Sequence, residues 1–316
     1  MSRIEEALRR SHRADPSEPT SGNNGAESFK SPWDFSDKDV AVVPTGPVTV
    51  VSPESERSLA AQPHVSGPVS AHALTPLAAG KGVVISGFNS EWKQRLVTAE
   101  GRDPFLVEQF RRLAATLHQA RANSDLKSVM VTSASPNDGK TLTAINLALI
   151  LSESYRRQVL LIDADLRRPS IRDVRHMPDV VGLSDGLRAA TEQKLTVFRL
   201  TETLSLLPAG RPDPDPMGSL TSTRMHRILV DACNLYDWVV VDAPPVGTVS
   251  DASLLAGMVD GALLVVRAGQ TDCALTQKSI EAIGRERILG VILNGAEIAP
   301  TDREYYRAYA EPAKPE

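Results

Sequence analysis

The chain has 316 residues, of which 41% are apolar, and its formal net charge is −4. This composition is typical of a folded protein that buries a sizeable core, and it excludes a strongly basic protein of the kind that binds nucleic acid. No apolar run approaches the ~20 residues of a membrane-spanning helix, and the first residues lack the apolar core of a signal peptide. The two cysteines, Cys233 and Cys273, have no metal-ligand spacing, which favours a reducing compartment. We therefore expect a cytoplasmic protein without a nucleic-acid partner.

Composition divides the chain into three parts. The first 80 residues hold nine of the 22 prolines and few large apolar residues, so they bury too little surface to offset chain entropy. We predict a mostly disordered tail over residues 1–95, with a short helix at its start. A folded domain follows over residues 96–299, and a flexible segment over residues 300–316 closes the chain.

Within the predicted domain, apolar runs alternate with helical patterns, which is typical of a parallel sheet with crossover helices. Short strands are also possible at residues 82–87 and from Arg95 onward, and a helical pattern follows Pro104. The main predicted strands cover residues 129–132, 159–162, 204–207, 238–241, 262–266 and 291–293. The main predicted helices cover residues 141–153, 222–235, 251–258 and 274–284. Because ligands of such sheets bind beyond the carboxyl ends of the strands, the loops there are expected to carry the chemistry.

The loop after the first main strand resembles a phosphate-binding P-loop. The consensus is Gly, four residues, then Gly-Lys-Ser/Thr, and here Ala134 stands at the first position. Backbone N–H groups of such a loop hold phosphate oxygens, Lys140 supplies a positive charge, and the Thr141 hydroxyl suits Mg²⁺. The alternative is a strand-to-helix turn that binds nothing. The residues predicted to bind the nucleotide here are Ser135, Pro136, Asn137, Asp138, Gly139, Lys140, Thr141 and Leu142. The sequence thus predicts an α/β P-loop NTPase fold, with a mostly parallel sheet and helices on both faces.

Three aspartates follow two later strands. Asp163 and Asp165 come at the end of one apolar strand, where they can share a cation, and Asp242 follows another strand in the position of a Walker B aspartate. Carboxylates at these positions hold Mg²⁺ directly or through water. A single aspartate at a strand end can also cap a helix or stabilise a turn. All three together predict a metal site with Thr141, and a catalytic group of Lys140, Asp163, Asp165 and Asp242.

The order of P-loop, IDADLRRP (residues 162–169) and VVVDAPP (residues 239–245) resembles the bacterial tyrosine kinases of polysaccharide export, over roughly residues 105–295. This resemblance implies an ATP- and Mg²⁺-dependent enzyme that phosphorylates protein tyrosines. It further implies that Asp163 and Asp165 order the metal and activate the acceptor, and that Asn294 contacts the adenine.

The resemblance also assigns acceptors and partners. Three of the five tyrosines, Tyr305, Tyr306 and Tyr309, lie together near the end of the chain, and the family phosphorylates such a cluster between neighbouring subunits. The other interpretation is a short amphipathic helix that docks its aromatic side chains. The family further implies a separate transmembrane activator, or polysaccharide co-polymerase, that recruits the kinase to the inner face of the membrane. Enzymes of polysaccharide biosynthesis would be further substrates.

One departure from the family concerns self-association. The family carries Glu-x-x-Arg-x-x-Arg on a helix before the P-loop and uses it in ring assembly. Glu108 and Arg111 match this motif, but Ala114 replaces the last arginine. Glu108 and Arg111 are therefore predicted oligomerisation residues, and the number of subunits stays open.

Two alternative functions compete with the kinase. A positional ATPase of the septum-placing or plasmid-partition kind would share the fold, but those enzymes carry an extra lysine early in the loop, where this chain has Ser135. A regulatory scaffold would bind nucleotide without transferring phosphate. The positional ATPases do not need a tyrosine cluster, whereas Ala134 and Ala114 give the scaffold some support.

Overall fold

The computed structural model describes residues 74–75, 92, 95–97, 103–174, 180–190 and 195–297, all of which fall within one compact unit, Ser66–Glu316. The predicted N-terminal helix, most of the predicted tail and the three tyrosines lie outside the described residues. Among the residues that are described, no helix is both long enough and apolar enough to cross a bilayer.

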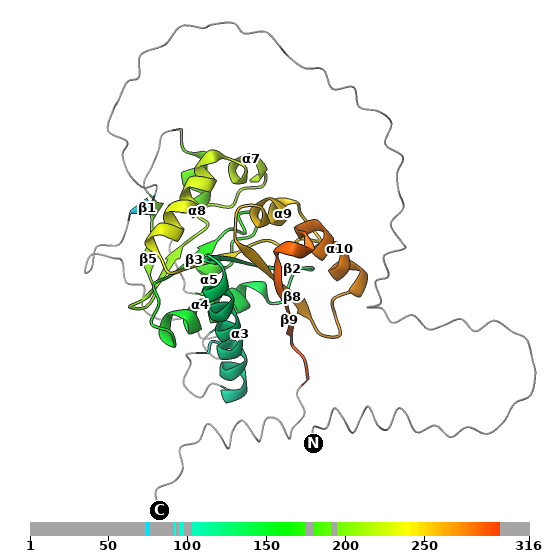
Figure 1. Ribbon diagram of the computed structural model, residues 1–316. Helices are drawn as coiled ribbons and strands as arrows, with labels where there is room; N and C mark the ends of the chain where they lie inside the picture. Colours follow the sequence, from blue (N-terminus) through cyan, green and yellow to red (C-terminus); the bar gives the residue numbers. More distant parts are fainter. Residues whose placement is uncertain are drawn as a thin grey trace, which may run out of the picture. The chain divides into compact units, whose positions relative to one another are not determined.

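A seven-stranded sheet forms the centre of the described part, in the order β5-β6-β3-β7-β2-β8-β9 (Figure 1). All neighbouring strands run parallel except the pair β5 and β6, which is antiparallel. The strands are β2 (Ser128–Ser133), β3 (Val159–Asp163), β5 (Phe198–Arg199), β6 (Leu204–Leu207), β7 (Trp238–Asp242), β8 (Gly261–Arg267) and β9 (Ile288–Asn294). A separate parallel pair joins β1 (Leu74–Thr75) to β4 (Leu195–Thr196). The order places β7 between β3 and β2, so the loops after these three strands are neighbours.

Helices cover both faces of the sheet. One face packs against α3 (Pro104–Asn123) and α4 (Lys140–Glu153). The other packs against residues of α6 (Leu183–Arg188), α7 (Met217–Leu220), α8 (Thr223–Leu235), α9 (Asp251–Ala256) and α10 (Cys273–Ile283). The remaining short elements are α5 (Ile171–Val174) and the 3₁₀ turn η1 (Arg285–Arg287).

Local sequence explains where the long helices begin. In α3 the Asp103 side chain accepts a hydrogen bond from the Phe105 N–H at 3.1 Å, and Pro104 occupies the first helical position. Both features are typical of helix starts.

In α4, twelve of the 14 residues are buried, because α3 covers the side of α4 that faces away from the sheet. The helix that follows the P-loop is therefore held on two sides.

The predicted α/β fold with a mostly parallel sheet is confirmed, and each of the six main strands and four main helices is present with bounds shifted by at most three residues. The prediction missed β5 and the short helices α5 to α7, because elements of two to six residues carry no readable periodicity. The strand expected from Arg95 onward is wrong where the chain is described, since residues 95–97 form a turn. Asn146 of α4 supplies the hydrogen bonds there, accepting from the Val97 N–H at 3.0 Å and donating to the Arg95 carbonyl at 3.1 Å.

Candidate functional site

The P-loop joins the end of β2 to the start of α4. Gly139 lies at the N-cap of α4 with φ of 100°, and Asn137 also has a positive φ, of 67°. Ala134 is fully buried and is absent from the positive-φ residues of the described chain. The first position of this loop therefore tolerates alanine, whereas Gly139 adopts a conformation that side chains strain.

The predicted nucleotide-binding residues divide by what they can offer. Pro136 and Asn137 are exposed, whereas Lys140 and Thr141 are buried in the first turn of α4. The Leu142 side chain packs against the core on the α3 and α4 face, so only its backbone is available to a ligand. The start of α4 thus presents one ammonium, one hydroxyl and its free backbone N–H groups, which is the arrangement that binds phosphate.

Asp138 shapes the loop from inside. Its side chain is 3% exposed, and its two oxygens accept hydrogen bonds from the Ser135 N–H at 2.9 Å and the Thr271 hydroxyl at 2.7 Å. The Asp138 carbonyl accepts from Asn294 Nδ2 at 2.8 Å. Asn294 also lies against Gly139, where an added Cβ would come within 2.1 Å of Nδ2. Two side chains therefore hold the P-loop in place: Thr271 from the loop that follows β8, and Asn294 from the end of β9.

Removing the Thr271 hydroxyl is expected to weaken nucleotide binding. Thr271→Val deletes the donor to a buried carboxylate, an interaction of about 1.5 kcal/mol or more, so the Kd for ATP should rise about tenfold or more. Thr271→Ser keeps the hydroxyl and should bind like the wild type. Isothermal titration of the three proteins measures this, and equal affinities would show that the loop keeps its shape without Thr271.

Lys140 lies between two carboxylates. Its Nζ is 2.8 Å from Asp165 Oδ2 and 3.7 Å from Asp242 Oδ1. Burial by itself would lower the pKa of Lys140, but the Asp242 and Asp165 carboxylates outweigh it and raise that pKa above its ordinary value. Lys140 therefore stays charged at the mouth of the P-loop, where a phosphate chain needs a cation.

Asp163 and Asp242 stand opposite each other at the ends of the neighbouring strands β3 and β7. Burial raises the pKa of Asp163 well above its usual range, and the nearby Asp242 adds to the effect. Burial also raises the pKa of Asp242, although the Lys140 ammonium works against it. Two adjacent buried carboxylates are costly without a cation between them, so this end of the sheet favours positive charge.

The residues present fit a Mg²⁺ ion in part. Both oxygens of Asp242 are buried and without a hydrogen-bond partner, and the Thr141 hydroxyl lies 3.2 Å from the Ser170 hydroxyl. Oxygen donors of this kind suit Mg²⁺, which keeps several waters and takes one or two protein ligands. No group of three His, Cys, Asp or Glu side chains among the described residues is arranged to hold a metal. Asp165 Oδ2 lies 2.8 Å from the Lys140 ammonium in this arrangement, and the metal set of Thr141 with the three carboxylates stays a prediction.

Asp163 and Asp165 also shape their own loop. Asp163 accepts from the Asp165 N–H at 3.3 Å and the Ile171 N–H at 3.2 Å. Asp165 Oδ1 accepts from the Arg168 N–H at 3.2 Å. These hydrogen bonds turn the chain so that Ser170 reaches Thr141.

Sequence reasoning missed four side chains of this region. Ser170, Thr271 and Arg267 contact the P-loop or its first helical turn, with Arg267 NH1 donating to the Asn137 carbonyl at 3.2 Å. Arg167 holds the buried Asp251 of α9 through two hydrogen bonds of 2.6 and 3.2 Å. The only sequence signal for any of these four residues was the pair of adjacent arginines after Asp165. In the structure, Arg167 of this pair joins the loop after β3 to α9 through Asp251.

The predicted oligomerisation residues lie on α3. Glu108 and Arg111 are partly exposed and 4.0 Å apart, and Arg112 Nε also reaches Glu108, at 3.7 Å. Ala114 is fully buried on the face toward α4. In this chain the third motif position therefore points into the core, and Glu108 pairs with Arg112 as well as with Arg111.

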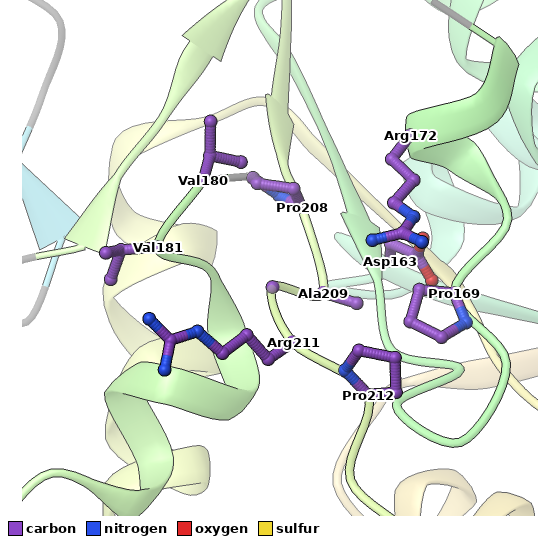
Figure 2. Close-up of a pocket in the computed structure, with 10 residues that line it drawn as sticks. Asp163, Pro169, Arg172, Val180, Val181, Pro208, Ala209, Arg211 and Pro212 are labelled. Atoms are coloured by element: carbon purple, nitrogen blue, oxygen red, sulfur yellow. The ribbon is translucent and has the colours of Figure 1, made fainter. Parts of the chain in front are cut away.

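A cavity of about 440 Å³ opens beside Asp163 (Figure 2). Its walls come from the loops that follow β3 and β6, and they include Pro169, Arg172, Val181 and Arg211. The cavity lies on the opposite side of the P-loop strand from β8 and β9 in the sheet order.

The chain matches the sequence pattern of the CobQ/CobB/MinD/ParA nucleotide binding domain over residues 129–314. It is 35% identical to the tyrosine-protein kinase YwqD of Bacillus subtilis over 195 residues, which cover 61% of this chain and 82% of YwqD. It is 33% identical to the succinoglycan biosynthesis transport protein ExoP of Rhizobium meliloti, covering 65% of this chain but only 26% of ExoP.

A solved structure agrees with the sequence matches. The kinase domain of the Escherichia coli tyrosine kinase Etk superposes with a TM-score of 0.55 at 31% identity, covering 61% of this chain and 78% of that domain. The nucleotide-binding pattern spans more than half of the chain, and YwqD is covered over most of its length. The chain therefore belongs to the CobQ/CobB/MinD/ParA nucleotide-binding family and, within it, to the bacterial tyrosine-protein kinases.

Proposed function

We propose that this protein-tyrosine kinase uses ATP and Mg²⁺ to phosphorylate Tyr305, Tyr306 and Tyr309 of a neighbouring copy, in the control of exopolysaccharide synthesis and export. The observation that carries the proposal is the buried Asp242 carboxylate. It has no hydrogen-bond partner and lies 3.7 Å from the P-loop lysine. A buried carboxylate whose oxygens lack hydrogen bonds is costly unless a ligand completes its surroundings.

Each residue then has a defined task. The backbone N–H groups at the start of α4 and the Lys140 ammonium bind the phosphate chain, and Asn294 at the end of β9 faces the adenine side. Thr141 and Asp242 hold Mg²⁺, with Asp165 positioning Lys140 through their 2.8 Å contact. When bound, the ion neutralises charge on the phosphate oxygens.

Asp163 acts on the acceptor tyrosine, as the group that accepts its phenolic proton. The tyrosine oxygen forms a bond to the γ-phosphorus while the bond from that phosphorus to the bridging oxygen breaks, and ADP leaves with that oxygen. The phenolic proton passes to the Asp163 carboxylate. Asp163 suits this role because it lines the cavity between the loops that follow β3 and β6, and among the described residues its oxygens accept two backbone N–H groups, at 3.2 and 3.3 Å.

Partners belong to the same proposal. The matched region makes up 26% of ExoP, a transport protein by its printed name, so in that relative the kinase-like part accompanies a much larger remainder. We infer that a separate transmembrane polysaccharide co-polymerase recruits this chain to the inner face of the membrane. Copies of the chain associate through the α3 residues Glu108 and Arg111. Polysaccharide-biosynthesis enzymes are further substrates of the kinase.

Changing the three tyrosines together tests the proposal. The chain carrying Tyr305→Phe, Tyr306→Phe and Tyr309→Phe should take up no phosphate after incubation with ATP and Mg²⁺, yet bind ATP like the wild type. Peptide mass spectrometry of dephosphorylated starting material locates the phosphate. Phosphate on Tyr155 or Tyr236 of the triple variant would show that one of these residues, and not the three C-terminal tyrosines alone, is an acceptor. A wild type that binds ATP and never phosphorylates tyrosine, even with a membrane partner, would support a nucleotide-gated scaffold.

A further inference from the structure

The cavity beside Asp163 has walls that suit an aromatic ring. Apolar atoms come from Val180, Val181 and Pro208, together with prolines 169 and 212. Its volume of about 440 Å³ lies within the range of ligand pockets. Aromatic side chains gain most from such walls, and tyrosine also needs one polar partner for its hydroxyl. Asp163 is the carboxylate of this lining, so a phenol seated here has an acceptor for its proton.

The same cavity carries two positive charges. Figure 2 shows the Arg172 side chain directed toward Asp163, whereas Arg211 extends along the opposite wall near Val181. The Arg211 side chain is 84% exposed, and its Nε lies 3.7 Å from Asp185. An exposed arginine at a pocket rim attracts a carboxylate of an incoming segment and discriminates against a basic one.

The three tail tyrosines differ in the charges beside them. Tyr305 follows Glu304 directly and has Asp302 three residues before it, with Arg303 between these two acidic residues. Tyr306 is followed directly by Arg307, and Tyr309 is flanked by alanines. The arginine at the rim, Arg211, and Arg172 deeper in the cavity therefore complement the glutamate directly before Tyr305 best.

We propose that this cavity is the acceptor-tyrosine site, and that Arg172 and Arg211 select tyrosines preceded by an acidic residue, which makes Tyr305 the first residue to be phosphorylated. The inference rests on the proposed kinase function and adds to it a substrate class and two specificity residues. The sheet order supports it, because Asn294 and Arg267 reach the P-loop from β9 and β8, whereas the cavity opens from β3 and β6 on the other side. Nucleotide and acceptor then approach the phosphate-transfer point from opposite sides.

The experiment separates the enzyme from the acceptor, using full-length chains for both. The enzyme carries the three tyrosine-to-phenylalanine changes, and the acceptor carries Lys140→Met with its tyrosines intact. Acceptors with and without Glu304→Gln are compared by the rate of phosphate appearance on Tyr305. The change should slow Tyr305 about two- to fivefold, the size of effect that one exposed ion pair supplies, and should leave the rate on Tyr309 unchanged.

Variants of the enzyme test whether Arg172 and Arg211 cause the preference for an acidic residue before the tyrosine. Arg211→Gln and Arg172→Gln should each shrink the Glu304 effect, and together they should abolish it. Arg211→Glu should reverse the preference, so that an acceptor with Glu304→Lys becomes the better substrate. Lys278→Gln is the matched control, because Lys278 is exposed on α10 and is not part of the cavity lining, and it should keep the full Glu304 effect. Melting temperatures of all enzymes verify that they are folded.

Three results separate failure of this inference from failure of the kinase function. Phosphate transfer that responds equally to Glu304→Gln in the wild-type and double-arginine enzymes would reject the cavity as the selecting site. The same rejection follows if Tyr309 is phosphorylated before Tyr305. No phosphotyrosine in any combination, including the unmodified chain with itself, would instead reject the kinase function.

Discussion

Lys140→Met is expected to lower tyrosine phosphorylation by at least about 10²-fold, because it removes the buried cation that neutralises charge developing on the phosphate. The same change leaves Asp165 and Asp242 without the ammonium that lies 2.8 and 3.7 Å from them. Removing one partner of a buried ion pair is strongly destabilising. The variant should therefore melt at a lower temperature than the wild type in the absence of nucleotide. Phosphopeptide mass spectrometry and a thermal melt of the same samples measure both effects.

A control distinguishes the loss of charge from the loss of fold. Lys278→Met removes an exposed lysine from α10, and it should change neither phosphorylation nor melting temperature. If Lys140→Met kept phosphorylation within tenfold of the wild type, the assignment of Lys140 to the phosphate chain would be wrong. A large loss of phosphorylation with an unchanged melting temperature would show that the carboxylates do not depend on the lysine for their stability.

Asp242→Asn is expected to change activity and stability in opposite directions. The wild-type carboxylate is fully buried with both oxygens lacking a hydrogen-bond partner, and it faces Asp163 across the β3–β7 pair. A neutral amide removes the repulsion and the cost of a buried charge, while Lys140 keeps its 2.8 Å contact with Asp165. The nucleotide-free variant should melt about 2–4 °C higher, while phosphorylation falls by about 10²-fold or more, because a charged Mg²⁺ ligand is lost.

The stability gain of Asp242→Asn should depend on pH. The pKa of Asp242 is raised in the folded protein above the ordinary value of an aspartate, with burial as the main cause. A carboxyl whose folded pKa is raised binds more protons when folded than when unfolded, so the wild type loses stability as the pH rises through that raised pKa. The variant should therefore gain stability over the wild type at neutral pH, and the difference should vanish below about pH 4.

Asp260→Asn is the matched control for that experiment. Asp260 Oδ2 accepts hydrogen bonds from the Lys127 and Ser128 N–H groups at 2.9 and 2.7 Å, so its charge is already compensated and no gain in melting temperature is expected. An Asp242→Asn variant that melts below the wild type at neutral pH would mean that the carboxylate stabilises the nucleotide-free fold. In that case the argument for a ligand-completed site would fail.

Much of the site could be predicted because its parts are local in sequence. The β-branched run before Ala134 predicts a buried strand, and Gly139 marks the backbone position at the start of α4 that requires a positive φ. The same holds for Asp163 and Asp242, whose positions at the ends of apolar runs place them at one edge of a parallel sheet. Each of these inferences needs only a local pattern: the period of a strand with the identity of its last residue, or a glycine at the start of a helix.

Contacts between distant residues could not be read in this way. Thr271 reaches Asp138 across 133 positions, and Asn294 reaches the same residue across 156. Neither contact follows from a pattern, because both depend on β8 lying beside β2 and on β9 lying beside β8 in the sheet. The pairing of Lys140 with Asp165 likewise depends on how the loop after β3 turns, which the Asp163 hydrogen bonds decide.

The sequence by itself determined the fold class, the P-loop and the two strands that end in aspartates, since these features follow from local periodicity and backbone conformation. Only the folded arrangement shows which carboxylate hydrogen-bonds to Lys140, which keeps just the longer ion pair with it, and where the cavity beside Asp163 opens. The physical reason is the strand order: β7 lies between β3 and β2, so charges from three separate segments meet in a buried space, where their burial and mutual repulsion set which of them needs a ligand.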